Sequence, residues 1–417
     1  MKSTSRTYVL VLSAIALIHY SCSDDVVGPV DAPGNQSNER ISITNDESAL
    51  DPRVRYFDQE VPIGSGGFGL MAKRTRLQAF SLTLVAEVIP PTVSGQVVQA
   101  TSTAMKLDDR AIVSYNMRGG QYLGGIDVFK FPPSGVPKLK SEALFNDSDI
   151  SSVSYDADKV YLAEATGDAM FPYPAVFEVM NMTKDKLVLE GNQRFPLTSF
   201  AGTSVALSSN NIYVTSGDNG RLSVFDRTTL ALKDSFDLID ARWVDVDGGK
   251  VVVVQGGTPG QISVFDEASL SVLNTFTFTG ADIPESKSTV QVVGGKAFIA
   301  AGTGGVQVLS VNTGTVVGSV PRPDPASLGL DPSKVVTNAV SVAGDLMFIS
   351  NGEAGVYVAQ AAVPFDQSGS EDPLNLTVLG QLQFDNLQSV NHVAYNGTFL
   401  VIAAGLGGLK MVRVDLM

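Results

Sequence analysis

Residues 211–238 read NIYVTSGDNGRLSVFDRTTLALKDSFDL, and residues 250–278 read KVVVVQGGTPGQISVFDEASLSVLNTFTF. Each stretch holds an alternating apolar segment that ends in small residues, a second one after a glycine-containing loop, and a third after a turn that contains Thr or Ser. Because alternation with a period of two is typical of half-buried strands, both stretches predict consecutive antiparallel β-strands joined by tight turns.

The same pattern recurs along most of the chain. Its most regular element occurs in seven copies: AIVSYN (111–116), VYLAEA (160–165), IYVTSG (212–217), VVVVQG (251–256), AFIAAG (297–302), MFISNG (347–352) and LVIAAG (400–405). A small apolar residue stands at one fixed distance before every copy, at Ala104, Val153, Val205, Val244, Val290, Val340 and Val393. Hairpin signals such as DVDGGK and QVVGGK lie between that residue and the copy, so each unit has a strand before the copy and further strands after it. Units of four strands that repeat about every 48 residues are typical of propeller blades.

The fold predicted is therefore all-β: a seven-bladed β-propeller of four-stranded antiparallel blades, closed by an N-terminal strand. The seventh unit reaches Met417 directly after its third strand, so its blade needs an outer strand from elsewhere. The segment SLTLVAEVIPPT (81–92) reads like the fourth strands of other units and is expected to supply it. Eight blades remain an alternative, because residues 55–80 show further apolar alternation.

The units at 211–238 and 250–278 resemble the YVTN-type β-propeller repeat, which runs through a strand, a Gly-rich turn, a V-x-V-x-D strand and a Thr-rich turn. The other blades fit this outline more loosely. The resemblance implies that a propeller face binds a ligand or partner, and it carries no catalytic residues. The only tryptophan, Trp243, is followed by Val244, so the repeated Trp-Asp dipeptide of another propeller class is absent.

The charge balance argues against a nucleic-acid partner. The chain has 29 Lys and Arg residues against 43 Asp and Glu residues, which gives a formal net charge of −14. Such a surface repels a polyphosphate backbone. We therefore expect no nucleic-acid binding. We also expect no resident cofactor and a monomeric protein.

The N-terminus has the features of an export signal. Lys2 and Arg6 precede an apolar run over residues 8–18, and Ser21 precedes Cys22, the only cysteine. This segment resembles a bacterial lipoprotein signal, although His19 stands where that family prefers Leu. The resemblance implies cleavage of residues 1–21, lipidation of Cys22, and a lipid-anchored protein of the cell outer membrane, periplasmic or surface-exposed. The alternatives are an ordinary signal peptide and an uncleaved anchor.

Composition then predicts a boundary at residue 51. Residues 22–51 are rich in Asp, Ser, Asn, Gly and Pro without a sustained period, so they are expected to be a flexible tether. Residues 52–417 are expected to form the propeller.

Candidate ligand-binding residues come from aligning the blades. First strands line the channel of a propeller, so residues at equivalent positions just before the conserved apolar residue should lie near one channel entrance. The distinctive ones are Arg242, Asn338 and Asn391 in one ring and Trp243 and His392 in the next. The turn carboxylates Asp168, Asp218 and Glu353 are expected to gather on the same face, near Arg118.

No catalytic or metal site is predicted. A calcium site needs roughly six to eight oxygen ligands, and no local loop supplies them. Asp226 and Asp266 stand before Thr- or Ser-containing turns and are expected to cap them. We therefore expect a binding or scaffold module for a protein, glycan or small ligand, and the alternative is a propeller-type hydrolase or lactonase that acts at the channel mouth.

Overall fold

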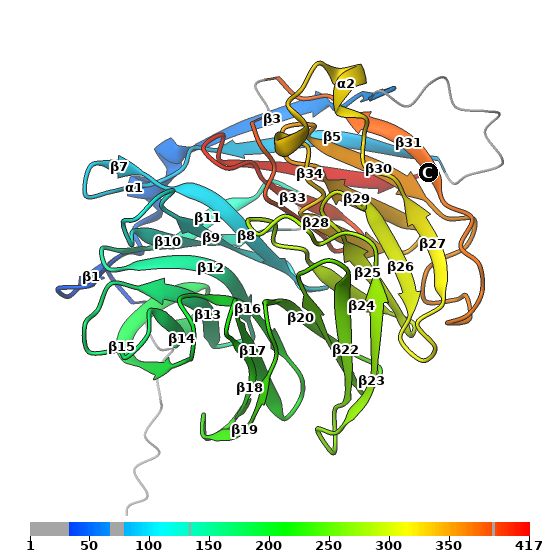
Figure 1. Cartoon of the computed structure of the whole chain (residues 1–417). Helices are drawn as coiled ribbons and strands as arrows, with labels where there is room; N and C mark the ends of the chain where they lie inside the picture. The colour runs from blue at the N-terminus through cyan, green and yellow to red at the C-terminus, as the bar shows by residue number, and fades with distance from the viewer. Residues whose placement is uncertain (1–32, 67–78, 133–134, 386–387) are drawn as a thin grey trace, which may run out of the picture. The chain divides into compact units, whose positions relative to one another are not determined.

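Seven antiparallel sheets of at least four strands follow one another along the chain, which confirms the seven-bladed β-propeller (Figure 1). The computed structural model describes residues 33–66, 79–132, 135–385 and 388–417. Blade one contains β8 (Gln99–Met105), β9 (Arg110–Asn116), β10 (Gly124–Lys130) and β11 (Lys138–Phe145). Blade two contains β12 (Ser148–Tyr155), β13 (Lys159–Thr166), β14 (Ala175–Thr183) and β15 (Lys186–Pro196). Blade three contains β16 (Gly202–Leu207), β17 (Asn211–Ser216), β18 (Arg221–Asp226) and β19 (Leu232–Asp237). Blade four contains β20 (Ala241–Asp247), β21 (Lys250–Gln255), β22 (Gly260–Asp266) and β23 (Val272–Phe278). Blade five contains β24 (Val290–Val293), β25 (Lys296–Ala300), β26 (Val306–Ser310) and β27 (Val316–Val320). Blade six contains β28 (Ala339–Ala343), β29 (Leu346–Ser350), β30 (Val356–Gln360) and β31 (Thr377–Leu382).

The seventh blade is completed by the N-terminal strand, as predicted. It contains β32 (His392–Tyr395), β33 (Phe399–Ala403), β34 (Leu409–Leu416) and β5 (Phe80–Val88). β5 pairs antiparallel with β34 over its whole length, from Leu409 opposite Val88 to Leu416 opposite Phe80. The two ends of the ring are therefore held together by main-chain hydrogen bonds within one sheet.

The segment before β5 adds strands to three blades. β1 (Gln36–Ser37) and β2 (Ile41–Thr44) extend blade one beyond β11, β3 (Val54–Glu60) extends blade seven beyond β5, and β4 (Ile63–Gly64) extends blade six beyond β31. The helix α1 (Glu47–Leu50) and the 3₁₀ turn η1 (Asp51–Arg53) connect β2 to β3. Residues 55–64 thus supply outer strands rather than an eighth blade, and residues 67–78 lie outside the described residues.

The flexible tether predicted for residues 22–51 is therefore wrong from β1 onward. Ile41 and Ile43 are each 1% exposed and pack into the apolar core between blades one and two. Two alternating isoleucines are too short a signal to outweigh the polar composition, but the open edge of β11 gives them main-chain partners. Residues 22–32 and the signal segment, including Cys22, lie outside the described residues.

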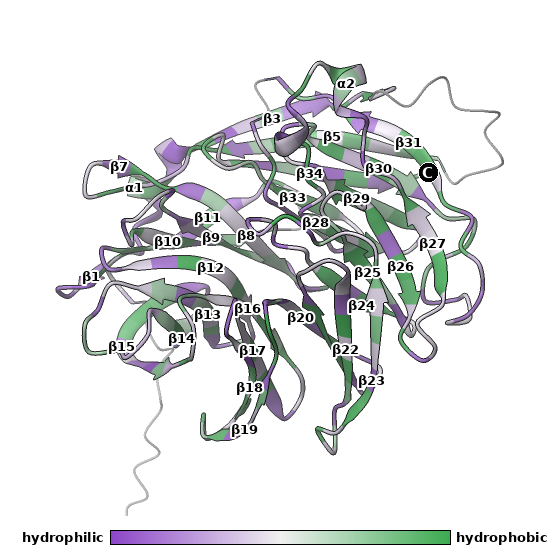
Figure 2. Ribbon diagram, viewed as in Figure 1, coloured by the Kyte–Doolittle hydropathy of each residue, from purple (hydrophilic) through white to green (hydrophobic). Residues whose placement is uncertain are grey.

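The apolar core lies between neighbouring blades. The cluster between blades three and four, for example, joins Tyr213 and Val224 to Val251 and Phe265. Figure 2 shows the corresponding alternation of hydrophobic and hydrophilic residues along the strands. Each blade therefore depends on its neighbours to bury its faces.

Turn chemistry follows the sequence. Gly248 and Gly249 have φ of 57° and 75° in the β20–β21 hairpin, a conformation that two-residue hairpin turns require. The Asp226 carboxylate accepts hydrogen bonds from the N–H groups of Thr228 and Thr229, and Asp266 caps the equivalent turn through Ser269. The capping role predicted for both aspartates is confirmed.

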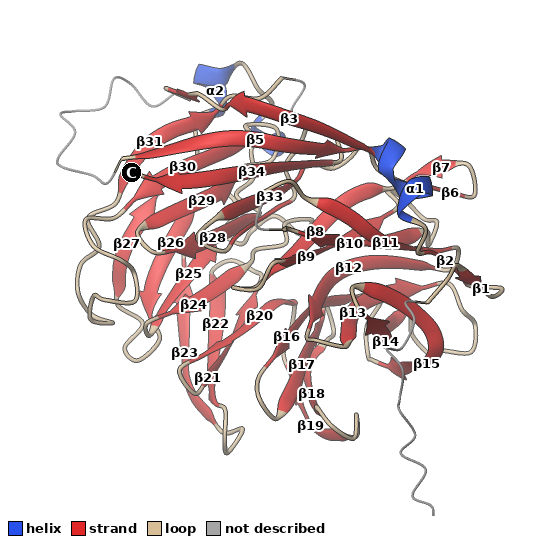
Figure 3. Ribbon diagram, turned by 180° about the vertical axis from the view of Figure 1, so that it is seen from behind, coloured by secondary structure: helices blue, strands red, loops and turns tan. Residues whose placement is uncertain are grey.

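Helical structure is slight in the described residues (Figure 3). The helix α2 (Pro325–Leu328) and the 3₁₀ turn η2 (Pro332–Lys334) lie in the connection between blades five and six, and a small hairpin of β6 (Thr92–Val93) and β7 (Gln96–Val97) follows β5. Within the part of the chain that the structure describes, no helix has the length and apolarity needed to cross a membrane.

Candidate functional site

A cavity of about 870 Å³ opens where the first strands of several blades begin. Its walls come from the connections between blades and from the loops between second and third strands. They include Gln99, Arg118, Ile283, Glu285, Ser286, Leu330, Ser333, Lys334, Val336, Asn338, Gly352, Glu353, Gln388, Ser389, Asn391, Gly405 and Leu406. We call this cavity the mouth. The mouth brings together the predicted residues Asn338, Asn391 and Glu353, with Arg118.

The mouth carries charges that the protein does not neutralise. Arg118, Lys334, Glu285 and Glu353 line it, and within the described residues none of the four makes an ion pair or a side-chain hydrogen bond. Two cations and two anions are thus available to a ligand. This mixture of charges favours a ligand that itself carries both positive and negative groups.

Amide side chains form the inner wall of the mouth. The Asn391 Nδ2 atom donates to the carbonyl oxygen of Ala100 at 2.8 Å, and the Gln99 Nε2 atom donates to Asn116 Oδ1 at 3.0 Å. Asn338 donates to the carbonyl oxygen of Val390 at 3.4 Å. The amide nitrogens therefore fix the blades, and the side-chain oxygens are left as acceptors.

Arg242 has a structural role in the wall beside the mouth. Its guanidinium pairs with both Asp240 oxygens, at 3.0 and 2.6 Å, and donates to the carbonyl oxygen of Ile283 at 2.8 Å. A further contact joins it to Ser288 Oγ at 3.3 Å. Arg242 therefore holds the connection over residues 283–288 in place.

Trp243 and His392 meet deeper in the channel. Their rings stack with centroids 5.2 Å apart, and His392 Nδ1 lies 3.2 Å from Thr103 Oγ1. Both rings line a second cavity of about 360 Å³, together with Asp245 and Thr289. Burial, with the nearby Lys287 charge second, lowers the pKa of His392 to about 3, so the imidazole is neutral at neutral pH.

Lys287 lines neither cavity itself, but Ser286 before it lines the mouth and Thr289 after it lines the second cavity. Its Nζ donates to the carbonyl oxygen of Ser151, across the channel in blade two, at 2.8 Å. The same atom is 5.8 Å from the centre of the Trp243 ring. Burial lowers the pKa of Lys287 to about 8.

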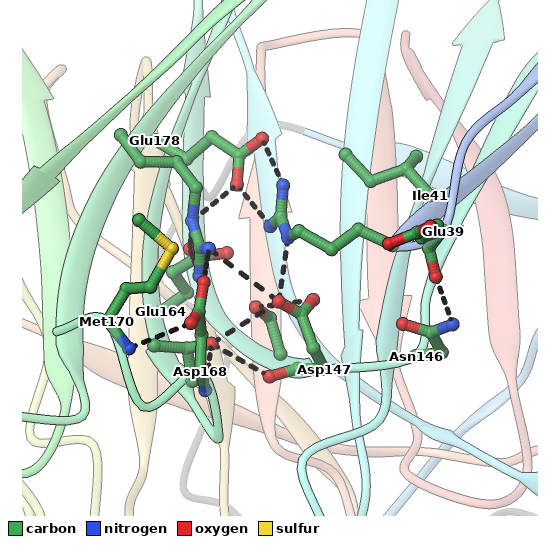
Figure 4. A network of polar contacts seen from close by, with 12 residues as sticks. Glu39, Ile41, Asn146, Asp147, Glu164, Asp168, Met170 and Glu178 are labelled. Carbon is green, nitrogen blue, oxygen red and sulfur yellow. Dashed lines mark hydrogen bonds and ion pairs between the residues drawn. The ribbon is translucent and has the colours of Figure 1, made fainter.

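Asp168 lies away from the mouth, in an ion-pair cluster between blades one and two. Figure 4 shows Asp147, Asp168, Glu164 and Glu178 around two guanidinium groups. Those groups belong to Arg194, 2.9 Å from Asp168, and to Arg40, 2.7 Å from both Asp147 and Glu178. Burial, with the Glu178 carboxylate second, raises the pKa of Glu164 well above its usual range. A cavity of about 660 Å³ adjoins the cluster, and three of the charged residues that line it, Arg40, Asp147 and Asp168, are already in ion pairs.

Asp218 does not reach the mouth either. It is exposed in the loop between β17 and β18, and its carbonyl oxygen accepts a hydrogen bond from the Asp240 N–H group at 2.9 Å. Asp168 and Asp218 therefore do not join Glu353 in the mouth, although all three stand in loops between second and third strands. Across the described ranges, no group of three or more His, Cys, Asp and Glu side chains is arranged to hold a metal ion.

Sequence reasoning missed Lys287, Lys334, Glu285 and Gln99. A signal for Lys287 was present, because the other six blades carry small or apolar residues at its register: Thr101, Ile150, Gly202, Ala241, Thr337 and Val390. The other three stand in connections or at a strand end, where the repeat gives no register to compare.

Comparison with solved structures finds the same fold at low sequence identity. The WD40 repeats of RRP9 match with a TM-score of 0.54 and 12% identity, over 87% of this chain and all of that one. A chain of the Mitotic Checkpoint Complex matches with a TM-score of 0.53 and 12% identity, over 83% of this chain and 97% of that one. No protein-family model and no curated protein matches the sequence. These likenesses show the fold alone.

Proposed function

We propose that the protein is a binding module that holds a polar segment of a partner protein in the mouth. The observation that carries this proposal is a set of four charged side chains around one opening, none of which has an ion-pair partner among the described residues: Arg118, Lys334, Glu285 and Glu353. Charges of both signs left exposed in a recess select a complementary partner and orient it. The blades beneath supply a rigid support, so little ordering is lost on binding.

A protein segment fits the mouth better than a glycan or a small apolar ligand. Amide oxygens of Asn338, Asn391 and Gln99 are suited to main-chain N–H groups, and Ile283, Leu330 and Leu406 offer apolar contact. No aromatic side chain lines the described mouth, so a sugar ring finds no face on which to stack. Small-molecule pockets are predominantly apolar, whereas this one is bordered by charges and amides.

The hydrolase or lactonase alternative gains no support from the site. Its mechanism would need carboxylates that converge at the channel mouth. Of the carboxylates considered for that role only Glu353 lines the mouth, where Glu285 joins it; Asp168 lies in the ion-pair cluster and Asp218 in an exposed loop, and no third carboxylate of the described residues lines the mouth.

Selection from a random-peptide library on the immobilised full chain tests the binding proposal. We expect the selected peptides to bind R118E/E353R at least about tenfold more weakly, a loss of about 1.4 kcal/mol, because the swap keeps the net charge and reverses the pattern in the mouth. The matched control R221D/D237R swaps an exposed pair on blade three. Equal binding to R118E/E353R, or binding only to a glycan array, would contradict the proposal.

We further propose that this module belongs to the cell envelope, anchored at Cys22 to the outer membrane, and that its blades are of the YVTN type. The support is in the sequence: Lys2, Arg6, the apolar run over 8–18 and Ser21 before Cys22, and the repeats at 211–238 and 250–278.

Metabolic labelling with a clickable fatty acid in a Gram-negative host tests the anchor. We expect the full chain to be labelled and to fractionate with the outer membrane, and C22S to lose the label and become soluble. An unlabelled wild-type chain would refute the anchor and leave the binding proposal untouched.

A further inference from the structure

Lys287 is a cation placed inside the channel. It belongs to the connection between blades four and five that Arg242 fixes through Ile283 and Ser288. Its neighbour Ser286 lines the mouth, and the Trp243 ring that its ammonium approaches lines the deeper cavity. The side chain therefore stands at the level where the mouth ends.

No carboxylate of the described residues pairs with this ammonium. The groups around it are the Ser151 carbonyl oxygen, the Trp243 ring and, stacked on that ring, the neutral His392. The nearby Arg242 is already paired with Asp240. Asp245, two residues after Trp243, makes no ion pair with the described residues, and its carboxylate accepts a hydrogen bond from the Val292 N–H group at 2.7 Å. One carbonyl and one aromatic face are a weak substitute for the water that Lys287 has lost.

Two lysines that are more fully buried than Lys287 are better compensated. Lys410 pairs with Glu87, and Lys296 is surrounded by the carbonyl oxygens of Gly294, Ser368 and Gly369. Lys287 has neither an anion nor such a cage. Lys287 is half-buried, and an unpaired charge that has lost water destabilises a fold. Because the preceding residue, Ser286, lines the open mouth, a partner for this charge is expected from outside the chain.

We propose that Lys287 binds a carboxylate of the ligand, so that the segment held in the mouth presents an acidic side chain to the channel. This inference rests on the proposed function and names the group that is recognised. At the opening, Arg118 and Lys334 attract a carboxylate, while Glu285 and Glu353 repel it, so the approach is favoured on the side of the two cations. The neighbouring His392 carries no charge that would compete for it.

The only tryptophan of the chain provides the measurement, because its ring is 5.8 Å from the Lys287 ammonium. The probes are N-acetyl-glutamic acid amide and its neutral counterpart N-acetyl-glutamine amide, titrated into the full chain at constant ionic strength. We expect a saturable change in Trp243 emission with the acidic probe and at least about a tenfold weaker response to the neutral one, as for loss of a charge-assisted hydrogen bond.

Three variants make the test specific. K287M should abolish the response, K287R should retain most of it, and K138M, an exposed lysine on blade one, should match the wild type. The proposal is overturned if both probes act equally or if K287M responds like the wild type. If K287M does not fold, the K287R response and the comparison of probes still decide.

The outcome is separable from that of the proposed function. Peptides that bind the mouth and depend on Arg118 and Glu353, without any effect of the acidic probe on Trp243, would remove the role of Lys287 alone. A response of Trp243 without peptide selection would remove the protein-segment proposal alone.

Discussion

Blades one, six and seven differ from blades three and four in how their outer edges are treated. The N-terminal segment adds β2, β4 and β3 to the first group, whereas β19 and β23 pair with no further strand within the described residues. β19 carries Lys233, Asp234 and Asp237, but residues 271–281 around β23 contain no charged residue. Edge strands invite pairing with other chains. One side of the molecule is thus protected by added strands, one blade by charge, and β23 by neither.

The covered side is also where buried charges are paired. Arg53 follows α1 and reaches the fully buried Asp127 of blade one at 2.8 Å, and it also contacts Glu142. Tyr115 donates to the same Asp127 carboxylate at 2.6 Å. The added strands are therefore fixed by an electrostatic contact to a central strand as well as by main-chain pairing.

Breaking that contact should have the largest effect. R53M leaves two carboxylates buried without a cation, and we expect it to lower the free energy of unfolding by about 3–5 kcal/mol. The matched variant is R221M on blade three, which has no added strand. It breaks an exposed pair with Asp237 and should lower the free energy of unfolding by less than about 1 kcal/mol. Urea unfolding at neutral pH measures both, and equal losses would show that the covering segment is not held by Arg53.

A half-buried carboxylate that has no cation beside it among the described residues, Asp245, extends the comparison. Burial raises the pKa of Asp245 in blade four to about 7, from 3.8. The folded state therefore holds a proton between about pH 4 and 7 that the unfolded state has lost, so stability falls as the pH rises through this window. The loss in the free energy of unfolding that the ionised Asp245 causes is complete above pH 7 and amounts to as much as about 4 kcal/mol.

D245N removes this loss of stability and can keep the hydrogen bond from the Val292 N–H group. We expect it to be more stable than the wild type at pH 8, by about 2–4 kcal/mol, and nearly equal to it at pH 4. Unfolding at the two pH values gives the difference, in which the other buried acids cancel. A variant that is less stable at both values would show that the Asp245 carboxylate is not an unpaired charge.

The smallest effect on stability is expected at the bare edge itself. T275K places a charge at an exposed position in the middle of β23, where Val272 and Leu273 are 56% and 41% exposed. Stability should change by less than about 0.5 kcal/mol, while aggregation on concentration, followed by light scattering, should decrease. Unchanged aggregation would show that this edge is not the adhesive one.

The blades and the closing strand could be predicted because their signals are local. Alternation, paired glycines such as Gly248 and Gly249, and turn-capping aspartates recur in register, so the second strands and β5 were found. The added strands were missed because β2 depends on an edge that exists only after blade one has formed. Lys287 was missed although its register can be compared, because it stands one position before the ring of Arg242, Asn338 and Asn391 from which the candidates were taken.

The candidate site shows the same division. Equivalent register brought Asn338 and Asn391 to the mouth and stacked Trp243 on His392 across the channel. Register could not predict the positions of Asp168 and Asp218, because loop side chains are placed by their own partners; Asp168, in the loop after β13, pairs with Arg194 of β15.

The closure of blade seven also sets an order of events during folding. Glu87 of β5 and its partner Lys410 of β34 are separated by 323 residues. During synthesis on the ribosome, β5 emerges early. Its apolar edge stays unpaired until β34, near residue 417, has been synthesised. Contacts that are so distant in sequence form slowly. Ring closure is thus the last step, and until then the edge of β5 that pairs with β34 is exposed to other chains.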